Sequence, residues 1–381
     1  MKPTETTSGL PSSADVVVVG GGFAGAAVAC FLCRKGLTDV LVLEAESQFG
    51  QHASGLNAAM ARQVTADPLT NEILSRSLSL LTAAGDDWPD TVDLRPGGSL
   101  LLTAKGRGDG LLSAARTAAE KGLDCRVLDR EGAMAMVPVL DPRAFDRAVY
   151  TASDGVVDIH GLLWRFLKTA RKGGARLVTS CRMTGVESRD GRVTAVTTDR
   201  GRVTCRVLVN AAGAWGNRLA ALVGLDPLAM TPYRRHLVTT PPLEVTDPGW
   251  PFVWDTTHDF YFRPEVGGLL LTPGDESPME PGDTPRDPAV LEILADKLAR
   301  YCPELSGIPV ARYWAGLRTI TRDSRFAVGW DGRMEGLFWV AGLGGHGMTA
   351  SSAVGEFSAD RILGNPVNES WKKGLAPNRL C

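Results

Sequence analysis

The sequence predicts an α/β fold combined with antiparallel β structure: a discontinuous, Rossmann-like nucleotide-binding domain with an inserted antiparallel-sheet domain. Three observations lead to this prediction. A β-α-β pattern with a glycine-rich turn occupies residues 16–44. Prolines, aromatic residues and alternating hydrophobicity characterise residues 227–317. A further strand, glycine loop and helix follow at residues 337–363, so nucleotide-binding elements lie at both ends.

The first element is a strand followed by a glycine-rich turn. Residues 16–19 are four consecutive valines, which is typical of a strand buried on both faces of a parallel sheet. Gly20, Gly22 and Gly25 then have the spacing G-x-G-x-x-G, and an apolar helix is expected over residues 26–35. Such glycines let the backbone approach a pyrophosphate bound at the N-terminus of the helix.

A second buried strand, residues 40–43, ends at Glu44, nineteen residues after Gly25. A carboxylate at this position can accept hydrogen bonds from ribose hydroxyls. A purely structural glycine turn does not explain this acid. The complete unit therefore predicts a dinucleotide-binding site.

The elements between the two nucleotide-binding patterns are predicted from periodicity and from turn residues. In chain order, they are a loop at 45–54, a long helix at 57–84, a strand at 94–102, helices at 111–121 and 161–172 separated by a proline-containing connector at 137–142, and a β-meander divided at Asp190-Gly191 and Arg200-Gly201. The meander leads into residues 207–215, where a buried strand gives way to small residues, as a backbone must when it passes a bulky ligand.

The second half of the chain changes character. An antiparallel sheet with one helix, residues 289–301, is expected within 227–317. A strand at 337–341, a glycine loop at 342–348 and a helix at 349–363 ending at Gly364 complete the chain.

Composition excludes several classes of function. The 381 residues carry a formal net charge of −2, so no broad basic face for nucleic acid is expected. No run of eighteen apolar residues is present, so no membrane-spanning helix is expected. Residues 1–14 are rich in Ser, Thr and Pro and lack an apolar segment, so they are predicted to be a disordered tail and not a signal peptide.

The seven cysteines show no disulfide-scaffold spacing, which fits a reduced cytoplasm. Cys30 and Cys33 form a C-x-x-C motif, but both fall on the helix after the glycines and no second pair follows. We therefore expect helix packing and no metal site.

Six segments, taken in order, resemble the flavoprotein family of D-amino acid oxidase, glycine oxidase, sarcosine oxidase and bacterial D-amino acid dehydrogenases. The resemblance extends over residues 15–365 and is greatest to D-arginine-type dehydrogenases and glycine oxidases. The segments that carry it are residues 20–25 with Glu44, 54–60, 208–215, 260–264, 314–318 and 342–348.

The resemblance implies an FAD-binding domain made of residues 15–88, 150–225 and 320–365. It implies a substrate-binding domain made of residues 89–149 and 226–319, with residues 366–381 left as a C-terminal tail. The family oxidises the Cα–N bond of an amino acid by hydride transfer to FAD, giving an imine that water hydrolyses to a keto acid. The expected partner is therefore a small amino-acid substrate, with oxygen or a quinone as electron acceptor and no defined oligomeric state.

The residues predicted to surround FAD come from both chain ends, from the segment after the strand at 207–210, and from Met183. They are Gly20, Gly22, Phe23, Ala24, Gly25, Glu44, Ala45, His52, Ser54, Asn57, Ala58, Met183, Ala211, Ala212, Gly213, Trp215, Arg318, Gly344, Gly345, His346, Gly347 and Met348. Some sarcosine dehydrogenase-like relatives attach FAD to a His in the area of His52. The local pattern of this chain departs from theirs, so we expect non-covalent FAD. The Cys that monomeric sarcosine oxidases use for attachment has no counterpart between Arg318 and Phe326.

Oxidation of an amino acid requires a cationic fork for the substrate carboxylate and positive potential near the flavin N1–C2=O edge. Arg318 matches the family's fork, the alternative being a surface strand Arg in a salt bridge. Tyr261 shares the carboxylate if Phe260 and Phe262 face away, the alternative being a core Tyr. Arg235 matches a second carboxylate-binding Arg of the dehydrogenases.

Three features of the site stay open. Arg234, next to Arg235, points to the opposite face, so the register of that strand is ambiguous. The amides of the loop at 344–348 are placed to face the flavin C2 carbonyl, and His346 orients substrate or water or simply packs within this loop. Met60 indicates an apolar or small substrate side chain near the flavin, or core packing alone.

No acid is assigned opposite Arg318 and Tyr261, although Asp255, Asp259 and Glu265 lie near the Tyr261 strand. An unpaired cationic side chain is costly to bury, so an amino acid with an apolar or small side chain, or an N-substituted glycine, is expected to react faster than arginine or lysine. The D configuration of the substrate is implied by the resemblance alone.

Two alternative functions remain. A nicotinamide-dependent dehydrogenase would share the β-α-β unit but would not account for the C-terminal glycine loop and helix. A non-catalytic flavoprotein, or an electron-transfer subunit of an amine-oxidising complex, would bind flavin that no free amine reduces.

Overall fold

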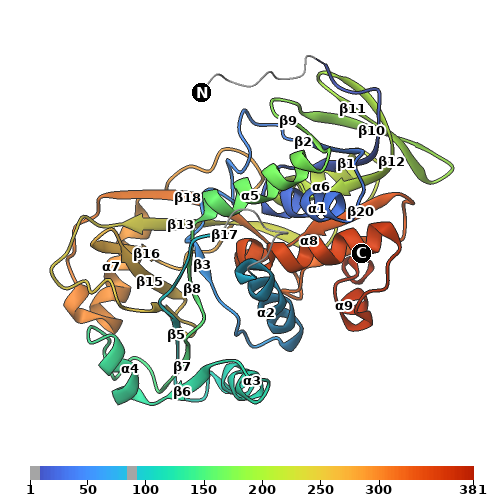
Figure 1. Ribbon diagram of the computed structural model, residues 1–381. Helices are drawn as coiled ribbons and strands as arrows, with labels where there is room; N and C mark the ends of the chain where they lie inside the picture. Colours follow the sequence, from blue (N-terminus) through green and yellow to red (C-terminus); the bar gives the residue numbers. More distant parts are fainter. Residues whose placement is uncertain (1–8, 84–91) are drawn as a thin grey trace.

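The computed structural model describes residues 9–83 and 92–381, and in this part of the chain it contains two large sheets and a small three-stranded one. The first sheet, on the right of Figure 1, combines strands from both ends of the chain with strands from residues 176–210. The second, on the left and below, is built mostly from the middle. The structure therefore has the predicted fold class, with α/β and antiparallel β structure combined in one chain.

The centre of the first sheet is parallel. Its strands lie in the order β9 (Arg176–Val178), β2 (Val40–Leu43), β1 (Ser13–Val19), β12 (Gly201–Asn210) and β20 (Leu337–Ala341). The short strand β19 (Ala327–Trp330) pairs antiparallel with β20 at one edge. The predicted meander is confirmed: β10 (Met183–Arg189) and β11 (Arg192–Thr198) form a hairpin, and β11 pairs antiparallel with the first half of β12.

The valines of β1 are buried on both faces, as predicted. Val16 and Val18 pack in the core formed with helices α1 (Phe23–Arg34), α5 (Ile159–Lys172) and α8 (Gly347–Leu363), and Val17 belongs to the core on the opposite face. Cys30 and Cys33 are buried free thiols within α1. Burial raises the pKa of the Cys30 thiol to about 12, so the C-x-x-C motif contributes packing at neutral pH.

The second sheet is almost entirely antiparallel, with β14 and β5 as a parallel pair. Its strands follow the order β17 (Ser277–Pro278), β13 (Met230–Thr239), β16 (Gly268–Thr272), β15 (Phe260–Glu265), β14 (Phe252–Asp255), β5 (Ser99–Thr103), β7 (Arg147–Thr151) and β6 (Cys125–Leu128). The long strand β18 (Arg312–Thr321) pairs with β13 along its whole length. The helix α7 (Ala289–Tyr301) has the predicted bounds, and α3 (Asp109–Glu120) and α4 (Arg130–Met136) also pack on this sheet.

The predicted helix at 57–84 is wrong in its first part. The helix α2 (Pro68–Thr82) begins eleven residues later, and residue 84 lies outside the described residues. Asp67 caps α2 by accepting a hydrogen bond from the amide of Thr70 at 3.0 Å, with Pro68 in the first turn. The residues before it instead supply β3 (Met60–Ala61), part of the small sheet with β8 (Gly155–Val157) and β4 (Leu94–Pro96).

The predicted strand at 94–102 is two strands, β4 and β5, divided at Gly97 and Gly98. Gly98 has a φ of +81°, and a Cβ at this position would lie 2.5 Å from the ring of Tyr150. Only glycine fits this turn, which directs β4 and β5 into different sheets.

The ends of the chain differ from simple tails. Of the predicted disordered tail at 1–14, residues 1–8 lie outside the described residues, and Ser13 and Ala14 belong to β1. At the other end, residues 366–381 contain α9 (Glu369–Gly374) and a 3-10 turn, and Leu375 and Leu380 are buried. Among the described helices, none combines the length and apolar character needed to cross a bilayer.

Candidate active site

A large cavity lies where the first sheet meets β13, β15 and β18 of the second sheet. Its wall includes the ends of β1, β2 and β12, the loop from residue 50 to 62, and the N-termini of α1 and α8. Every cofactor and catalytic residue predicted from the sequence lines this cavity, except Gly25. Residues separated by more than three hundred positions are therefore brought together at one site.

Gly20 and Gly25 make the turn before α1 compact. Gly20 has a φ of +104°, and a Cβ there would lie 2.3 Å from the carbonyl oxygen of Ala211 on the neighbouring chain segment. A Cβ on Gly25 would lie 2.0 Å from the carbonyl oxygen of Gly20. Gly25 therefore does not line the cavity, but it lets the first turn of α1 pack directly on the loop that precedes it.

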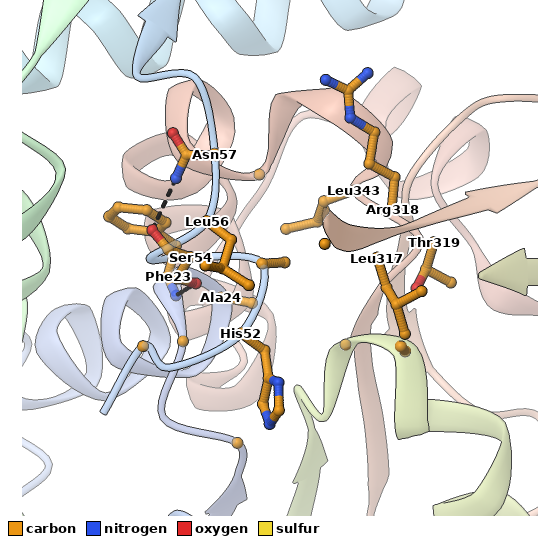
Figure 2. Close-up of a pocket in the computed structure, with 18 of the residues that line it drawn as sticks. Phe23, Ala24, His52, Ser54, Leu56, Asn57, Leu317, Arg318, Thr319 and Leu343 are labelled. Carbon is orange, nitrogen blue, oxygen red and sulfur yellow. Dashed lines mark hydrogen bonds between the residues drawn. The ribbon is translucent and has the colours of Figure 1, made fainter. Parts of the chain in front are cut away.

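Gly22 and Ser54 lie at the open N-terminus of α1. The hydroxyl oxygen of Ser54 accepts a hydrogen bond from the amide of Phe23 at 2.9 Å, as Figure 2 shows. A Cβ on Gly22 would lie 2.7 Å from the same oxygen. The absence of a side chain at Gly22 keeps this end of the helix accessible from the cavity, where the helix dipole favours an anion.

Glu44 is fixed at the end of β2 by backbone donors. Its Oε2 accepts from the amide of Gly21 at 2.8 Å and its Oε1 from the amide of Glu46 at 2.9 Å. The carboxylate is thereby oriented beside the glycine turn, and its remaining lone pairs are available to the hydroxyls of a ribose. The glycine turn, the open helix end and this acid together fit the diphosphate and ribose of FAD.

His52 lies on the opposite side of the view in Figure 2 from the guanidinium of Arg318. Its ring centroid is 4.6 Å from that of Trp215, and its Nε2 is 3.3 Å from Glu46 Oε1. Both neighbours line the cavity.

The start of α8 presents a second helix N-terminus to the same cavity. A 3-10 turn at Gly344–His346 precedes the helix, and residues 344–349 line the cavity. No side chain caps the amides of this first turn. They can therefore donate to a carbonyl oxygen or to a developing negative charge inside the cavity.

The loop before β3 is tied both to itself and to the second sheet. Asn57 donates to the carbonyl oxygen of Ser54 at 2.7 Å, which Figure 2 also shows, and accepts from the amide of Ala59 at 2.7 Å. Arg263 on β15 donates to the carbonyl oxygen of Ala58 at 2.8 Å. The loop is therefore a rigid part of the cavity wall.

Arg318 and Tyr261 form a hydrogen-bonded pair across β18 and β15. The Nη2 of Arg318 donates to the hydroxyl of Tyr261 at 2.8 Å. Tyr261 is fully buried and faces the cavity, as predicted. Phe260 and Phe262 face the other way, but they enter the core beneath the sheet and are not exposed.

Arg318 is not a surface strand residue in a salt bridge. It lines the cavity and forms no ion pair with a carboxylate in the described part of the chain. Gly345 permits its close approach, because a Cβ there would lie 3.3 Å from Nη1 of Arg318. The structure thus leaves this guanidinium available to an anionic ligand.

The register of β13 resolves the ambiguity between Arg234 and Arg235. Arg235 lines the cavity. Arg234 does not line it and instead donates from Nη2 to Asp287 Oδ2 at 2.9 Å. Arg235 donates to Asp259 Oδ2 at 3.1 Å and to Glu276 Oε1 at 2.7 Å. Its charge is already balanced by two carboxylates, which favours Arg318 as the carboxylate-binding residue.

The acids near the Tyr261 strand are likewise engaged. Asp259 pairs with Arg235, and Glu265 pairs with Arg263. Asp255 accepts from the amides of Thr257 and His258 and lies 2.8 Å from the His258 ring. None of these three acids lines the cavity, so none is placed to receive a cationic substrate side chain.

Arg62 and Trp254 line the cavity and were missed by the sequence analysis. The Nη2 of Arg62 lies 3.0 Å from Nε2 of His346, and its guanidinium carbon lies 4.0 Å from the centre of the Trp254 ring. The period-2 pattern that places Met60 at the cavity also places Arg62 there, with the buried Ala61 between them pointing away. This alternation along the sequence could have identified Arg62 as a cavity-lining residue.

The contact with Arg62 defines the state of His346. Because a guanidinium only donates hydrogen bonds, Nε2 of His346 accepts and the proton lies on Nδ1. Burial, together with the positive charges of Arg62 and Arg318, lowers the pKa of His346 well below 6.5. The imidazole is therefore neutral at physiological pH.

Comparisons with known proteins agree with this arrangement. A family model described as FAD dependent oxidoreductase matches residues 15–361. The chain is 24% identical to the mitochondrial pyruvate dehydrogenase phosphatase regulatory subunit of Mus musculus, with 96% of this chain and 43% of the relative covered. It is 26% identical to the sarcosine oxidase subunit beta of Rhizobium meliloti (strain 1021), with 81% and 75% covered. The chain thus spans less than half the length of the first of these relatives.

Among solved structures, L-proline dehydrogenase from P. horikoshii superposes with a TM-score of 0.86 at 24% identity, over 97% of this chain and 98% of that one. At this level of identity the likeness establishes the fold.

Proposed function

Because the chain belongs to the DAO family of FAD-dependent oxidoreductases, we propose that it oxidises the Cα–N bond of an amino acid or an N-substituted glycine. The observation that carries this proposal is the Arg318–Tyr261 pair, which faces the cavity without a carboxylate partner. Bound FAD would supply the acceptor for the hydride from Cα, and water would hydrolyse the resulting imine to a keto acid and ammonia, or to a keto acid and an amine from an N-substituted substrate.

The residues that would hold FAD belong to the first sheet and its loops. The N-terminus of α1 at Gly22 and Phe23 would bind the diphosphate, and Glu44 would bind the adenosine ribose. The amides at the start of α8 would donate toward the C2 carbonyl edge of the flavin. We propose these roles from the shape and the donors of the cavity.

Arg318 would bind the substrate carboxylate through its planar, bidentate guanidinium. The hydrogen bond from Arg318 to Tyr261 holds the guanidinium in place before substrate arrives, which lowers the entropy lost on binding. With the carboxylate fixed, the Cα–H bond is held in one orientation, and orientation is a large part of what a protein contributes to hydride transfer.

This proposal is tested by mixing the flavin-containing protein anaerobically with individual amines and recording the visible flavin absorbance. The panel contains glycine, sarcosine and both enantiomers of alanine, proline, glutamate and arginine. We expect at least one α-amino acid to bleach the flavin. Arginine should be among the slowest, because Asp255, Asp259 and Glu265 are paired within the protein and do not line the cavity. If the flavin stays oxidised with every compound but is reduced by dithionite, the protein is a non-catalytic or electron-transfer flavoprotein instead.

A further inference from the structure

We propose that the preferred substrate carries two carboxylates, one bound by Arg318 and the other by Arg62. This inference rests on the proposed function, since it names the class of amino compound that the same site oxidises. It replaces the apolar or small substrate side chain that Met60 alone indicates.

The arginines in and around the cavity differ in their ion pairing. Arg234, Arg235 and Arg263, on the neighbouring strands, each form an ion pair with a carboxylate of the protein. In the described part of the chain, Arg62 and Arg318 form none, although both line the cavity. Two unbalanced cations at one cavity call for two anionic groups from a ligand.

Arg62 also has a hydrogen-bond donor without a partner. Its Nε is shielded from solvent and has no hydrogen-bond partner, while the neutral His346 accepts from Nη2. Burial lowers the pKa of Arg62 to about 10, with Arg318 acting in the same direction, so the group remains charged but poorly solvated. A carboxylate is the ligand that would satisfy both its charge and its free donors.

Asp154 is the carboxylate with the largest electrostatic effect on Arg62, but it does not fill this role. Asp154 is fully buried, and its oxygens accept from Gln63 at 3.0 Å and from Ser99 at 2.7 Å. It forms no ion pair with Arg62, although it acts on it electrostatically over a longer distance. Arg62 therefore lines the cavity without an ion-paired carboxylate from the described part of the chain.

The two cations are held at separate positions by aromatic rings. Arg62 lies over Trp254, Arg318 contacts Tyr261, and the Trp254 and Tyr261 ring centroids are 4.9 Å apart. Each guanidinium is thus fixed beside its own ring. A substrate with two carboxylates joined by a short amine-containing chain can engage both, with one carboxylate on the reacting carbon.

The first experiment measures anaerobic flavin reduction with isosteric pairs of acid and amide. These are glutamate and glutamine, aspartate and asparagine in both enantiomers, and the achiral pair iminodiacetate and N-(carbamoylmethyl)glycine. We expect the acid of the best pair to react about 30- to 1000-fold faster than its amide, as for a lost charge-assisted contact. Equal rates within every pair would overturn the inference while leaving the proposed function intact, whereas no reduction by any amino compound would overturn the proposed function itself.

The second experiment changes Arg62. Arg62→Met should abolish the preference for acid over amide by slowing the acids about 30- to 1000-fold relative to their amides, whereas Arg62→Lys should restore part of the preference. Arg234→Met is the matched control, because Arg234 points away from the cavity, and it should leave the preference unchanged. If Arg62→Met slows acids, amides and monocarboxylates equally, Arg62 acts on the flavin or the fold and the inference is wrong.

A binding measurement makes the test independent of turnover. Glutarate and butyrate, which have no amine to oxidise, are titrated into the oxidised wild-type protein while the visible flavin spectrum is recorded. The concentration that gives half of the spectral change should be at least about tenfold lower for glutarate than for butyrate. Equal half-saturating concentrations for the two acids would contradict a second carboxylate site. This result stands even if Arg62→Met fails to fold.

Discussion

Arg318 shows how a single position of β18 acquires a function from its neighbours. Its strand alternation points it into the cavity, Tyr261 fixes its guanidinium, and Gly345 leaves it room. The same residue type at Arg235 is neutralised by Asp259 and Glu276. What distinguishes the two is the presence or absence of a carboxylate partner.

Replacing Arg318 is expected to impair turnover without loss of FAD. Arg318→Ala should lower kcat/KM by about 30- to 1000-fold, or about 2–4 kcal/mol, because a charge-assisted bidentate contact is lost. Arg318→Lys should recover only part of this, since the fork geometry is gone. Steady-state kinetics on samples with equal flavin content measure the effect. If Arg318→Ala had the kcat/KM of the wild type, another residue would bind the substrate carboxylate.

His346 makes stability depend on pH in a defined direction. Its pKa is lowered in the folded protein, so below pH 6.5 the unfolded chain binds a proton that the folded chain does not. The free energy of unfolding contributed by this group therefore falls as pH decreases below 6.5, by at most about 1.4 kcal/mol per pH unit.

The matched variant is His346→Gln, whose amide oxygen can still accept from Arg62. Between pH 6.5 and 5.5, with excess FAD, the wild type should lose about 1 kcal/mol more unfolding free energy than the variant. Asp154, whose pKa is raised to about 6 by burial, acts in the opposite direction in both proteins and cancels in the comparison. Urea unfolding at the two pH values measures this, and identical pH slopes would show that His346 is not the titrating group.

At the scale of elements, the site depends on two helix N-termini that open into one cavity. The α1 helix presents Gly22 and Phe23, and α8 presents the amides that follow Gly344–His346. The two helices pack against each other over the parallel sheet, so their ends are held at a fixed separation. This arrangement places two sites for negative charge in one cavity.

Closing one of these helix ends should abolish cofactor binding. Gly22→Glu would displace Ser54 from the amide of Phe23 and bring a negative charge to the diphosphate position, so we expect the purified protein to lack FAD. Gly282→Glu is the control, because a Cβ at Gly282 meets nothing within 4 Å. The flavin-to-protein absorbance ratio after gel filtration gives the answer, and a fully loaded Gly22→Glu protein would show that the diphosphate binds elsewhere.

At the scale of the whole molecule, sequence predicts well those elements whose signals are local. The valines of β1, the glycine turn, the meander and the bounds of α7 all follow from periodicity and turn residues within short windows. The first part of the predicted helix at 57–84 failed because apolar spacing there reflects a cavity-lining loop and β3. The strand at 94–102 failed because Gly98 turns the chain between two sheets.

The site was predictable only in part for a related reason. Its glycines and Arg318 lie in recognisable motifs, whereas Arg62 is defined by Trp254 and His346, which are 192 and 284 residues away in the sequence. Likewise, the neutralisation of Arg235 depends on carboxylates at 259 and 276. Charge balance inside a cavity is a property of the folded chain, and no local pattern encodes it.

A single-turnover experiment decides whether this flavoprotein oxidises an amino acid held by Arg318, as we propose. The flavin-loaded wild type and Arg318→Ala are mixed anaerobically with the most reactive amino acid, and flavin bleaching and keto acid formation are followed together. We expect the wild type to form keto acid in proportion to the flavin it reduces, and Arg318→Ala to do so at least about thirtyfold more slowly. Flavin that stays oxidised in the wild type, or equal rates in both proteins, would contradict the proposal.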